Sequence, residues 1–345
     1  MRALLDELTL PVMAAPMFLV SGPDLVVAAG RAGIVGAFPT QNCRTAEELD
    51  RWLATITEEL TVDGATLPWA VNLVTHRTNS RLAEDLALVA EYRPPLVVTA
   101  LGSPKPVLET VHAYGGTVIA DVADLAMARK AAAAGADGLA CISVGAGGHT
   151  GLLSPFAFTA AVREFFDGLL IIGGGISDGF GVAGAIAAGA DLVYMGTSFL
   201  ASQESLAVVD YKQMVVDCGI EDLIVSAGIT GTPASWLRPS LINHGIDPDT
   251  LDDTRSERNY QAGGDAVPCR CPTASSWWSC IWRRGASARS SRRWPCNTVS
   301  TNWSAWATPR TSPFWSRYPR SPIVRWPRRS SVSPIACPAY GPSRR

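Results

Sequence analysis

Eight short apolar runs, each followed by an amphipathic stretch, occupy the first two hundred residues and constrain the fold most. The runs cover residues 10–16, 33–38, 69–74, 96–100, 117–120, 138–142, 169–172 and 191–195. Helical apolar spacing predicts helices at residues 23–32, 45–60, 80–91, 104–113, 122–134, 155–166 and 179–188. Strands that are apolar on both faces and alternate with helices form parallel sheets. Eight such units predict an α/β fold, a closed (β/α)₈ barrel.

An open, doubly wound sheet is the alternative architecture with the same alternation. That fold usually carries a Gly-x-Gly-x-x-Gly turn after its first strand. Here the first run continues as Ala14-Ala-Pro-Met-Phe18, and Gly145-Ala-Gly-Gly-His-Thr150 lacks the third glycine of such a turn. The closed barrel is therefore the predicted fold, with its domain at residues 1–202.

Residues 203–263 are predicted to form a small helical cap after the eighth strand. Apolar residues recur with a helical period over 206–218. A further helix is expected to begin at Thr232, because Pro233 suits a first helical turn.

Residues 264–345 differ sharply in composition from the rest of the chain. From residue 266 onward there are 14 Arg, no Lys, no acidic residue and no Leu, with eight of the 11 Trp. A one-base shift of GC-rich codons over residues 285–297 yields ordinary enzyme sequence, so a shifted reading frame is one interpretation. A disordered basic tail is the other. Cys269-Arg-Cys271 lacks zinc-finger spacing, and no metal site is expected.

Charge and hydropathy exclude several classes of function. Residues 1–265 hold all 31 acidic residues but only 15 of the 29 Lys and Arg, so their formal charge is near −16. A strongly acidic body argues against nucleic acid as a partner. No run reaches the ~18 apolar residues of a membrane span, and the first residues are acidic where a signal peptide is apolar. A cytoplasmic protein is expected, and homo-oligomerisation stays open.

The stretch from Gly138 to Gly151 is predicted to be the active-site loop. It runs from an apolar strand into four glycines within seven residues, and glycine lets main chain approach a ligand closely. His149 is its one ionisable loop side chain, and a histidine exchanges protons near neutral pH. In a (β/α)₈ barrel the loops after strands seven and eight commonly bind phosphate. Both loops here are glycine turns, Gly173-Gly-Gly175 and Met195-Gly-Thr197.

Several other polar residues lie in or near the predicted strands, and each has its own expected role. Asn72, in the third strand, either serves a planar heterocycle or is satisfied by neighbouring backbone. Asp121 and Asp124 follow the fifth strand and are interpreted as caps of the next helix. His76 is expected to be a solvated loop residue, and Cys141 a small core residue rather than a nucleophile.

Five motifs, in their order and spacing, resemble those of the nitronate monooxygenases, formerly called 2-nitropropane dioxygenases. They are Ala15-Pro-Met17, Asn72-Leu73, Ala146-Gly-Gly-His-Thr-Gly151, Gly174-Gly-Ile176 and Met195-Gly-Thr197. The resemblance covers about residues 5–250 and implies an FMN-dependent (β/α)₈ barrel with His149 as the catalytic histidine. It implies cofactor contacts at Ala15, Pro16, Met17, Asn72, Gly147, Gly148, Gly174, Gly175, Tyr194, Met195, Gly196 and Thr197. The chain departs from the family pattern at Ile142, Gly145 and Tyr194, where relatives often carry Gln, Glu and Gln.

The resemblance implies that FMN and O₂ oxidise an alkyl nitronate, or a nitroalkane, to a carbonyl compound and nitrite. A flavin-dependent enoyl-ACP reductase or quinone reductase that uses NAD(P)H shares the same motifs and is the alternative enzyme. A flavin-binding protein inactivated by a shifted reading frame at the C-terminus is the alternative of another class.

Overall fold

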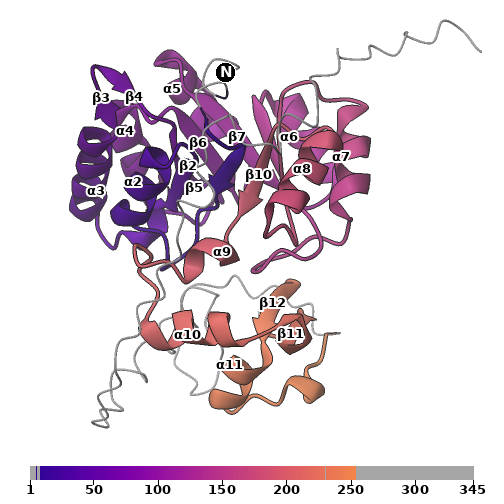
Figure 1. Cartoon of the computed structure of the whole chain (residues 1–345). Coiled ribbons are helices and arrows are strands. Elements are labelled where there is room, and N and C mark those ends of the chain that lie inside the picture. The colour runs from indigo at the N-terminus through magenta and orange to yellow at the C-terminus, as the bar shows by residue number, and fades with distance from the viewer. Residues whose placement is uncertain (1–4, 6–7, 230, 254–345) are drawn as a thin grey trace, which may run out of the picture. The chain divides into compact units, whose positions relative to one another are not determined.

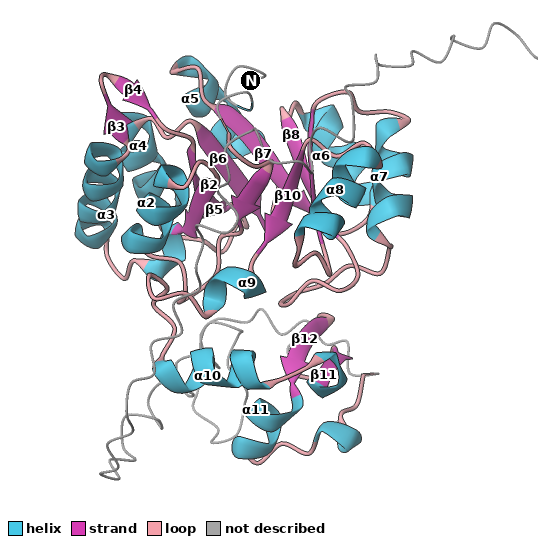
Figure 2. Cartoon of the chain, in the orientation of Figure 1, coloured by secondary structure: helices cyan, strands magenta, loops and turns pink. Residues whose placement is uncertain are grey.

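The computed structural model describes residues 5, 8–229 and 231–253, and its centre is a closed barrel of eight parallel strands (Figures 1 and 2). The strands are β1 (Val12–Ala14), β2 (Val35–Pro39), β5 (Trp69–Val74), β6 (Leu96–Ala100), β7 (Thr117–Val122), β8 (Gly138–Ile142), β9 (Leu169–Gly173) and β10 (Leu192–Met195). Each strand pairs with its sequence neighbours in the barrel, and β1 closes the ring against β10. The predicted (β/α)₈ fold is confirmed.

Seven helices connect these strands and surround the barrel, as the colouring of Figure 2 shows. They are α2 (Pro23–Arg31), α3 (Ala46–Glu59), α4 (Leu82–Tyr92), α5 (Lys105–Ala113), α6 (Leu125–Ala134), α7 (Pro155–Arg163) and α8 (Gly179–Ala187). The strand runs are apolar throughout because both faces are buried. Val97 and Val118 pack outward against the helices, whereas Val98 and Ile119 fill the barrel interior.

Short polar side chains set where the helices begin. Thr45 caps α3 by accepting a hydrogen bond from the Glu48 amide at 3.2 Å, as its spacing predicts. Asp124 caps α6 through the Met127 amide, and Asp178 caps α8 through the Gly181 amide. These caps satisfy N–H groups that have no partner within the helix.

Polar side chains tie the strands together at the end of the barrel where the strands begin. Asp191, just before β10, accepts the Leu170 amide at 2.8 Å and the Arg163 guanidinium at 2.6 Å. The same guanidinium donates to the carbonyls of Gly168 and Gly189. One arginine at the end of α7 thus joins the segments that lead into β9 and β10.

The segment after the barrel mixes helix and strand. It contains α9 (Thr197–Leu200), α10 (Val209–Asp217), β11 (Leu223–Ser226), β12 (Ala234–Leu237) and α11 (Arg238–Asn243). The helix predicted to begin at Thr232 was wrong, because β12 pairs antiparallel with β11 and the helix starts only at Arg238. The proline in the first turn of this helix is Pro239, at the second position of α11, and not Pro233 as predicted.

The structure adds one small element that the sequence did not predict. A two-stranded hairpin, β3 (Thr61–Val62) and β4 (Ala65–Thr66), follows α3 and was not predicted. The tail at 264–345 and the last ten residues of the predicted cap lie outside the described residues. Among the described helices, none has the length and apolar character to cross a membrane.

We expect Arg163→Ala to lower the free energy of unfolding by about 2 kcal/mol, because its hydrogen bonds to Gly168, Gly189 and Asp191 are lost together. Urea unfolding measures the change. The matched control is Arg31→Ala, which removes an exposed ion pair with Glu59 and should change stability by less than about 1 kcal/mol. Equal effects of the two substitutions would contradict this account.

Candidate active site

The loop after β8 is held in place by the glycine turn after β9. The Ser143 amide donates to the Gly173 carbonyl at 2.7 Å, and the Gly175 amide donates to the Gly145 carbonyl at 2.8 Å. A Cβ on Gly145 would lie 3.1 Å from the Gly175 nitrogen, and one on Gly174 would lie 2.6 Å from the Val144 oxygen. Much of the glycine content therefore lets two loops pack backbone against backbone.

Residues 233–235 fasten the other side of the same loop. Thr150 donates its amide to the Pro233 carbonyl at 3.0 Å, and the Ser235 amide donates to the Gly148 carbonyl at 2.9 Å. The Ser235 hydroxyl donates to the Ala146 carbonyl at 2.6 Å. His149 and Ala234 form an isolated antiparallel bridge between these hydrogen bonds. The segment after the barrel thus fixes the backbone of the predicted catalytic histidine.

His149 lies in this loop with an exposed side chain that makes no side-chain hydrogen bond to any described residue. The protein surrounding the ring still removes enough water to lower the pKa of His149 below its ordinary value. The imidazole is therefore mainly neutral at pH 7. A neutral imidazole has one N–H donor and one acceptor nitrogen, so it suits hydrogen bonding to a ligand oxygen.

The remaining glycines of the loop have different surroundings, and a Cβ on Gly151 would lie 2.2 Å from the Ile142 oxygen. A Cβ on Gly147 would lie 2.1 Å from the Thr197 hydroxyl, so the loops after β8 and β10 meet there. Apart from its chain neighbours, no described residue has an atom within 4 Å of a Cβ built on Gly148. The structure thus leaves room beside Gly148 and brings Gly147 next to the loop after β10.

The loop after β1 joins the same group of loops. A Cβ on Gly196 would lie 3.4 Å from the Met17 sulfur and 3.8 Å from the Ala15 side chain, and the Ala15 amide donates to the Met195 carbonyl. Asn42, which the sequence analysis did not single out, accepts the Leu19 amide at 2.7 Å. Its side-chain amide also donates to the Met17 carbonyl at 3.1 Å, so Asn42 fixes the shape of this loop.

Asn72 points into the barrel, with an exposed fraction of 5%. Its side-chain amide donates to the Val98 carbonyl at 3.3 Å. The neighbouring strand therefore satisfies one of its donors, as one of the two interpretations expected. The contact of Asn72 with a heterocycle remains a prediction.

Asp121 is not a helix cap, so that part of the prediction was wrong, whereas Asp124 caps α6 as expected. Asp121 belongs to β7 and alternates with Val122, so it shares the inward face with Ile119. Its Oδ1 atom is fully buried and has no hydrogen-bond partner among the described residues, and burial raises the pKa of the carboxyl to about 7. The period-two alternation of this strand is the sequence signal that identifies the inward position.

Tyr194 lies inside the same barrel, in β10, and is 6% exposed. Gly173 opposite it leaves the space, because a Cβ there would lie 2.8 Å from the Tyr194 Cβ atom. The Tyr194 hydroxyl is buried without a partner. Burial, and then the charge of Asp121, raise the pKa of this phenol well above its ordinary value. The barrel interior therefore holds two unpartnered polar groups close enough to influence each other.

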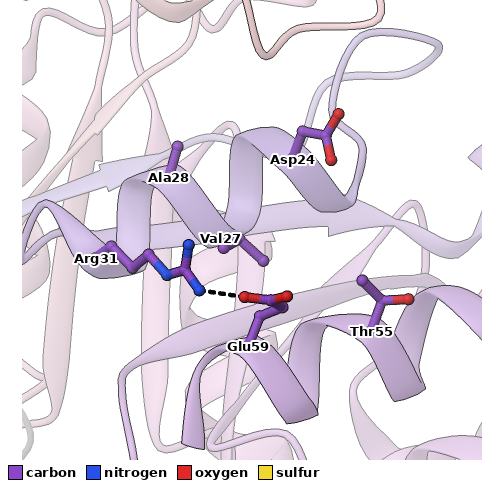
Figure 3. Close-up of a pocket in the computed structure, with 6 residues that line it drawn as sticks. All are labelled: Asp24, Val27, Ala28, Arg31, Thr55 and Glu59. Carbon is purple, nitrogen blue, oxygen red and sulfur yellow. Dashed lines mark hydrogen bonds and ion pairs between the residues drawn. The ribbon is translucent and has the colours of Figure 1, made fainter. Parts of the chain in front are cut away.

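Two cavities lie away from these groups. One, of about 270 Å³, lies between the outer helices α2 and α3 and contains the exposed pair Arg31 and Glu59 (Figure 3). The other, of about 150 Å³, lies between α7 and α8 behind Gly174 and is mostly apolar. Within the described residues, His, Cys, Asp and Glu form no group that could hold a metal ion. Cys141 is fully buried, as predicted.

The barrel with its cluster of glycine loops at the carboxyl ends of the strands is the architecture of a (β/α)₈ enzyme. The family model described as nitronate monooxygenase matches residues 2–249, and the chain belongs to this family. This membership identifies an oxidoreductase family and implies a flavin cofactor.

Individual relatives carry several names. An octahydro-indene-carboxyl-CoA dehydrogenase of Rhodococcus jostii is 30% identical over 233 residues, which are 68% of this chain and 64% of that protein. The chain thus covers less than two thirds of the length of this relative. A nitronate monooxygenase of Paraburkholderia phytofirmans is 28% identical over 76% of this chain and 83% of its own. The crystal structure of a nitroalkane oxidase from Streptomyces ansochromogenes is 26% identical, with a TM-score of 0.62, over 74% of this chain and 83% of that chain.

The described residues fit a flavin in two respects. The Gly148 position borders open space that a bound ring or chain can enter. The unpartnered Asp121 oxygen and Tyr194 hydroxyl are buried groups that a bound molecule with polar edges would satisfy. The Gly175 amide, in contrast, already donates to Gly145, so it is not free to bind phosphate.

We expect Asp121→Asn to stabilise the protein at neutral pH. The pKa of this carboxyl rises from 3.8 to about 7 on folding, so wild type loses stability as pH increases from about 4 to about 7. The variant lacks this loss and should be more stable by about 2 to 4 kcal/mol above pH 7, with no difference below pH 4. Denaturant unfolding at a series of pH values measures it. Parallel pH dependences would contradict the burial of this carboxylate.

We expect Gly147→Ala to weaken flavin binding at least tenfold, because the new Cβ would collide with Thr197 and separate the loops after β8 and β10. Flavin absorbance after gel filtration and a fluorescence titration with the free cofactor measure the change. Gly184→Ala is the control, because a Cβ there meets only an ordinary contact at 3.9 Å with Phe156. Equal flavin content in both variants contradicts the expectation.

Proposed function

We propose that this protein binds FMN at the barrel mouth and oxidises alkyl nitronates with O₂. The observation that carries the proposal is the placement of His149. Its backbone is fixed on both sides by hydrogen bonds, while its side chain projects from a glycine loop beside open space. The family membership and the similarity to a nitroalkane oxidase support the same chemistry.

The FMN phosphate is assigned to the turn after β10. The amide of Gly175 and the start of α8 are already occupied, by Gly145 and by the Asp178 carboxylate. The turn after β10 has no side-chain cap, Thr197 lies beside Gly147, and Gly196 lies beside Met17 and Ala15. Backbone N–H groups at such a turn bind phosphate without Lys or Arg. The contacts of Ala15, Pro16, Met17, Asn72, Gly148, Gly174 and Met195 with the cofactor belong to this proposal.

His149 is assigned to the substrate. Because its pKa is lowered, the neutral ring can donate one N–H to an oxygen of the nitronate and hold the anion in place. The residues 233–235 keep this donor in position, and we propose that residues 203–263 act as a cap beside the mouth while residues 1–202 form the barrel. The chemistry supplied by bound FMN is oxidation of the nitronate with O₂, which releases a carbonyl compound and nitrite.

We expect His149→Gln to lower kcat/KM for ethyl nitronate by about 10² to 10⁴, because a positioned donor at the reacting group is lost. Oxygen uptake and nitrite release measure turnover, and absorbance confirms that flavin stays bound. His244→Gln is the control, since His244 interacts with the Ser240 carbonyl beyond the barrel and should leave kcat/KM unchanged. Wild-type turnover by the His149 variant refutes the assigned role.

A flavin-dependent reductase or dehydrogenase is the second candidate, favoured by the 30% identity to a dehydrogenase whose name specifies a CoA thioester. The two candidates differ in what reduces the flavin. Anaerobic mixing with NADH or NADPH, followed by mixing with ethyl nitronate, distinguishes them. Bleaching by the nicotinamide alone, without nitronate turnover, would replace the nitronate proposal with this one.

A further inference from the structure

Asn42 ends the short 3₁₀ turn η1 (Thr40–Asn42) after β2, and its side chain is buried, with an exposed fraction of 8%. Its Oδ1 atom accepts the Leu19 amide at 2.7 Å, and its Nδ2 atom donates to the carbonyls of Met17 at 3.1 Å and Ser21 at 2.7 Å. A side-chain amide offers an acceptor oxygen and two N–H donors, so both kinds of group are used here. All three bonds go to the loop after β1, which lies 21 to 25 residues earlier in the chain.

The loop after β1 has a conformation that its sequence does not favour by itself. Leu19 has a φ of 60°, in the left-handed region that residues other than glycine seldom occupy. A residue keeps such a conformation only where the surrounding structure imposes it. The Asn42 oxygen binds the Leu19 amide, and the Asn42 amide group binds the carbonyls on either side of Leu19. Asn42 therefore supplies contacts that hold the loop in this shape.

The segment that carries Asn42 is itself held by the residues at the start of α4. Arg81 donates to the Cys43 carbonyl at 2.6 Å and to the Asp85 carboxylate at 2.8 Å. Asp85 is 1% exposed, and a buried carboxylate is stable only when it is paired in this way. The main chain next to Asn42 is thus fixed from outside the loop after β1, so Asn42 is a support for that loop rather than a side chain that adapts to it.

The shape of the loop after β1 determines what lies beside the turn after β10. A Cβ on Gly196 would lie 3.4 Å from the Met17 sulfur and 3.8 Å from the Ala15 side chain, so both pack closely against this glycine. On the other side of the same turn, Thr197 lies beside Gly147. The turn after β10 is therefore held between the loop after β1 and the loop after β8.

We propose that Asn42 is a positioning residue for the phosphate of FMN. By holding Met17 against Gly196, it keeps the turn after β10 in the shape that binds the phosphate, without touching the cofactor itself. This role rests on the proposed function, which assigns the phosphate to that turn, and it identifies what supports the turn. A site that already has its binding conformation binds more tightly, because less conformational freedom is lost on binding.

The test compares FMN with riboflavin, which is the same flavin without the phosphate. Fluorescence titration of the flavin-free protein gives the dissociation constant of each. Asn42→Ala should weaken the binding of FMN at least tenfold and that of riboflavin less than about threefold, because the phosphate contact depends most on the supported turn. The measured quantity is therefore the preference for FMN, the ratio of the two dissociation constants, which a uniform loss of affinity does not change.

Arg163→Ala is the matched control for a loss of stability. The Arg163 side chain also joins distant segments through main-chain carbonyls, those of Gly168 and Gly189. These bonds lie at the opposite end of the barrel, where the strands begin. Arg163→Ala should therefore leave the preference for FMN unchanged.

Two further variants test how Asn42 acts. Glycine adopts the left-handed conformation readily, so in a Leu19→Gly background the loop depends less on Asn42. Asn42→Ala should then reduce the preference for FMN by a smaller factor than it does in the wild-type background. Asn42→Asp keeps the side-chain volume but loses both N–H donors to Met17 and Ser21, so it should also reduce the preference. It replaces Asn42→Ala if that variant yields no folded protein.

An unchanged preference for FMN in the Asn42 variants overturns the positioning role. Equal losses of affinity for FMN and riboflavin overturn it as well, because they indicate that the whole site has loosened.

The same measurements distinguish this role from the proposed function. Wild type that prefers FMN through Asn42 but does not oxidise ethyl nitronate supports the positioning role and refutes the proposed oxidation. Wild type that oxidises ethyl nitronate and keeps its preference for FMN without Asn42 overturns the positioning role alone. Wild type that binds the two flavins equally well overturns both the phosphate assignment and the role of Asn42.

Discussion

The candidate site depends on the direct packing of two glycine loops, the one after β8 and the turn after β9. Hydrogen bonds from Ser143 to Gly173 and from Gly175 to Gly145 join them, and any side chain at Gly145 or Gly174 would strike the opposite backbone. This contact fixes the path of the main chain just before His149. Gly145 and Gly174 are therefore required first by the packing of the protein itself, whereas Gly148 borders open space.

A second constraint comes from beyond the barrel. The backbone on both sides of His149 bonds to residues 233–235, about 85 residues further along the chain. Catalytic groups act best when the surrounding structure holds them before substrate arrives, because no reorganisation is then needed. The mixed segment after the barrel thus contributes to the site without supplying a side chain to its chemistry. These hydrogen bonds are made at the start of β12, where the sequence predicted a helix beginning near Pro233.

The barrel interior contains both apolar and polar side chains. Ile119 and Val98 are among the apolar side chains, whereas Asn72, Asp121 and Tyr194 carry the polar groups. Asn72 finds a partner in the neighbouring strand, but Asp121 and Tyr194 do not. Buried polar groups cost stability unless they are hydrogen-bonded, so these two groups are candidates for contact with a bound molecule.

The sequence by itself determined the barrel, the order of its strands and the loop that carries His149. Strand and helix periods are local properties of the chain, and eight repetitions leave few alternative folds. Only the tertiary structure showed the enclosed Asp121 oxygen and the hydrogen bond from Asn72 to Val98. Whether a strand residue faces inward, and whether its polar atoms find partners, depends on strands that are distant in the sequence. The same reason explains why Pro233 was assigned to a helix: pairing with β11, a long-range interaction, overrode a local signal.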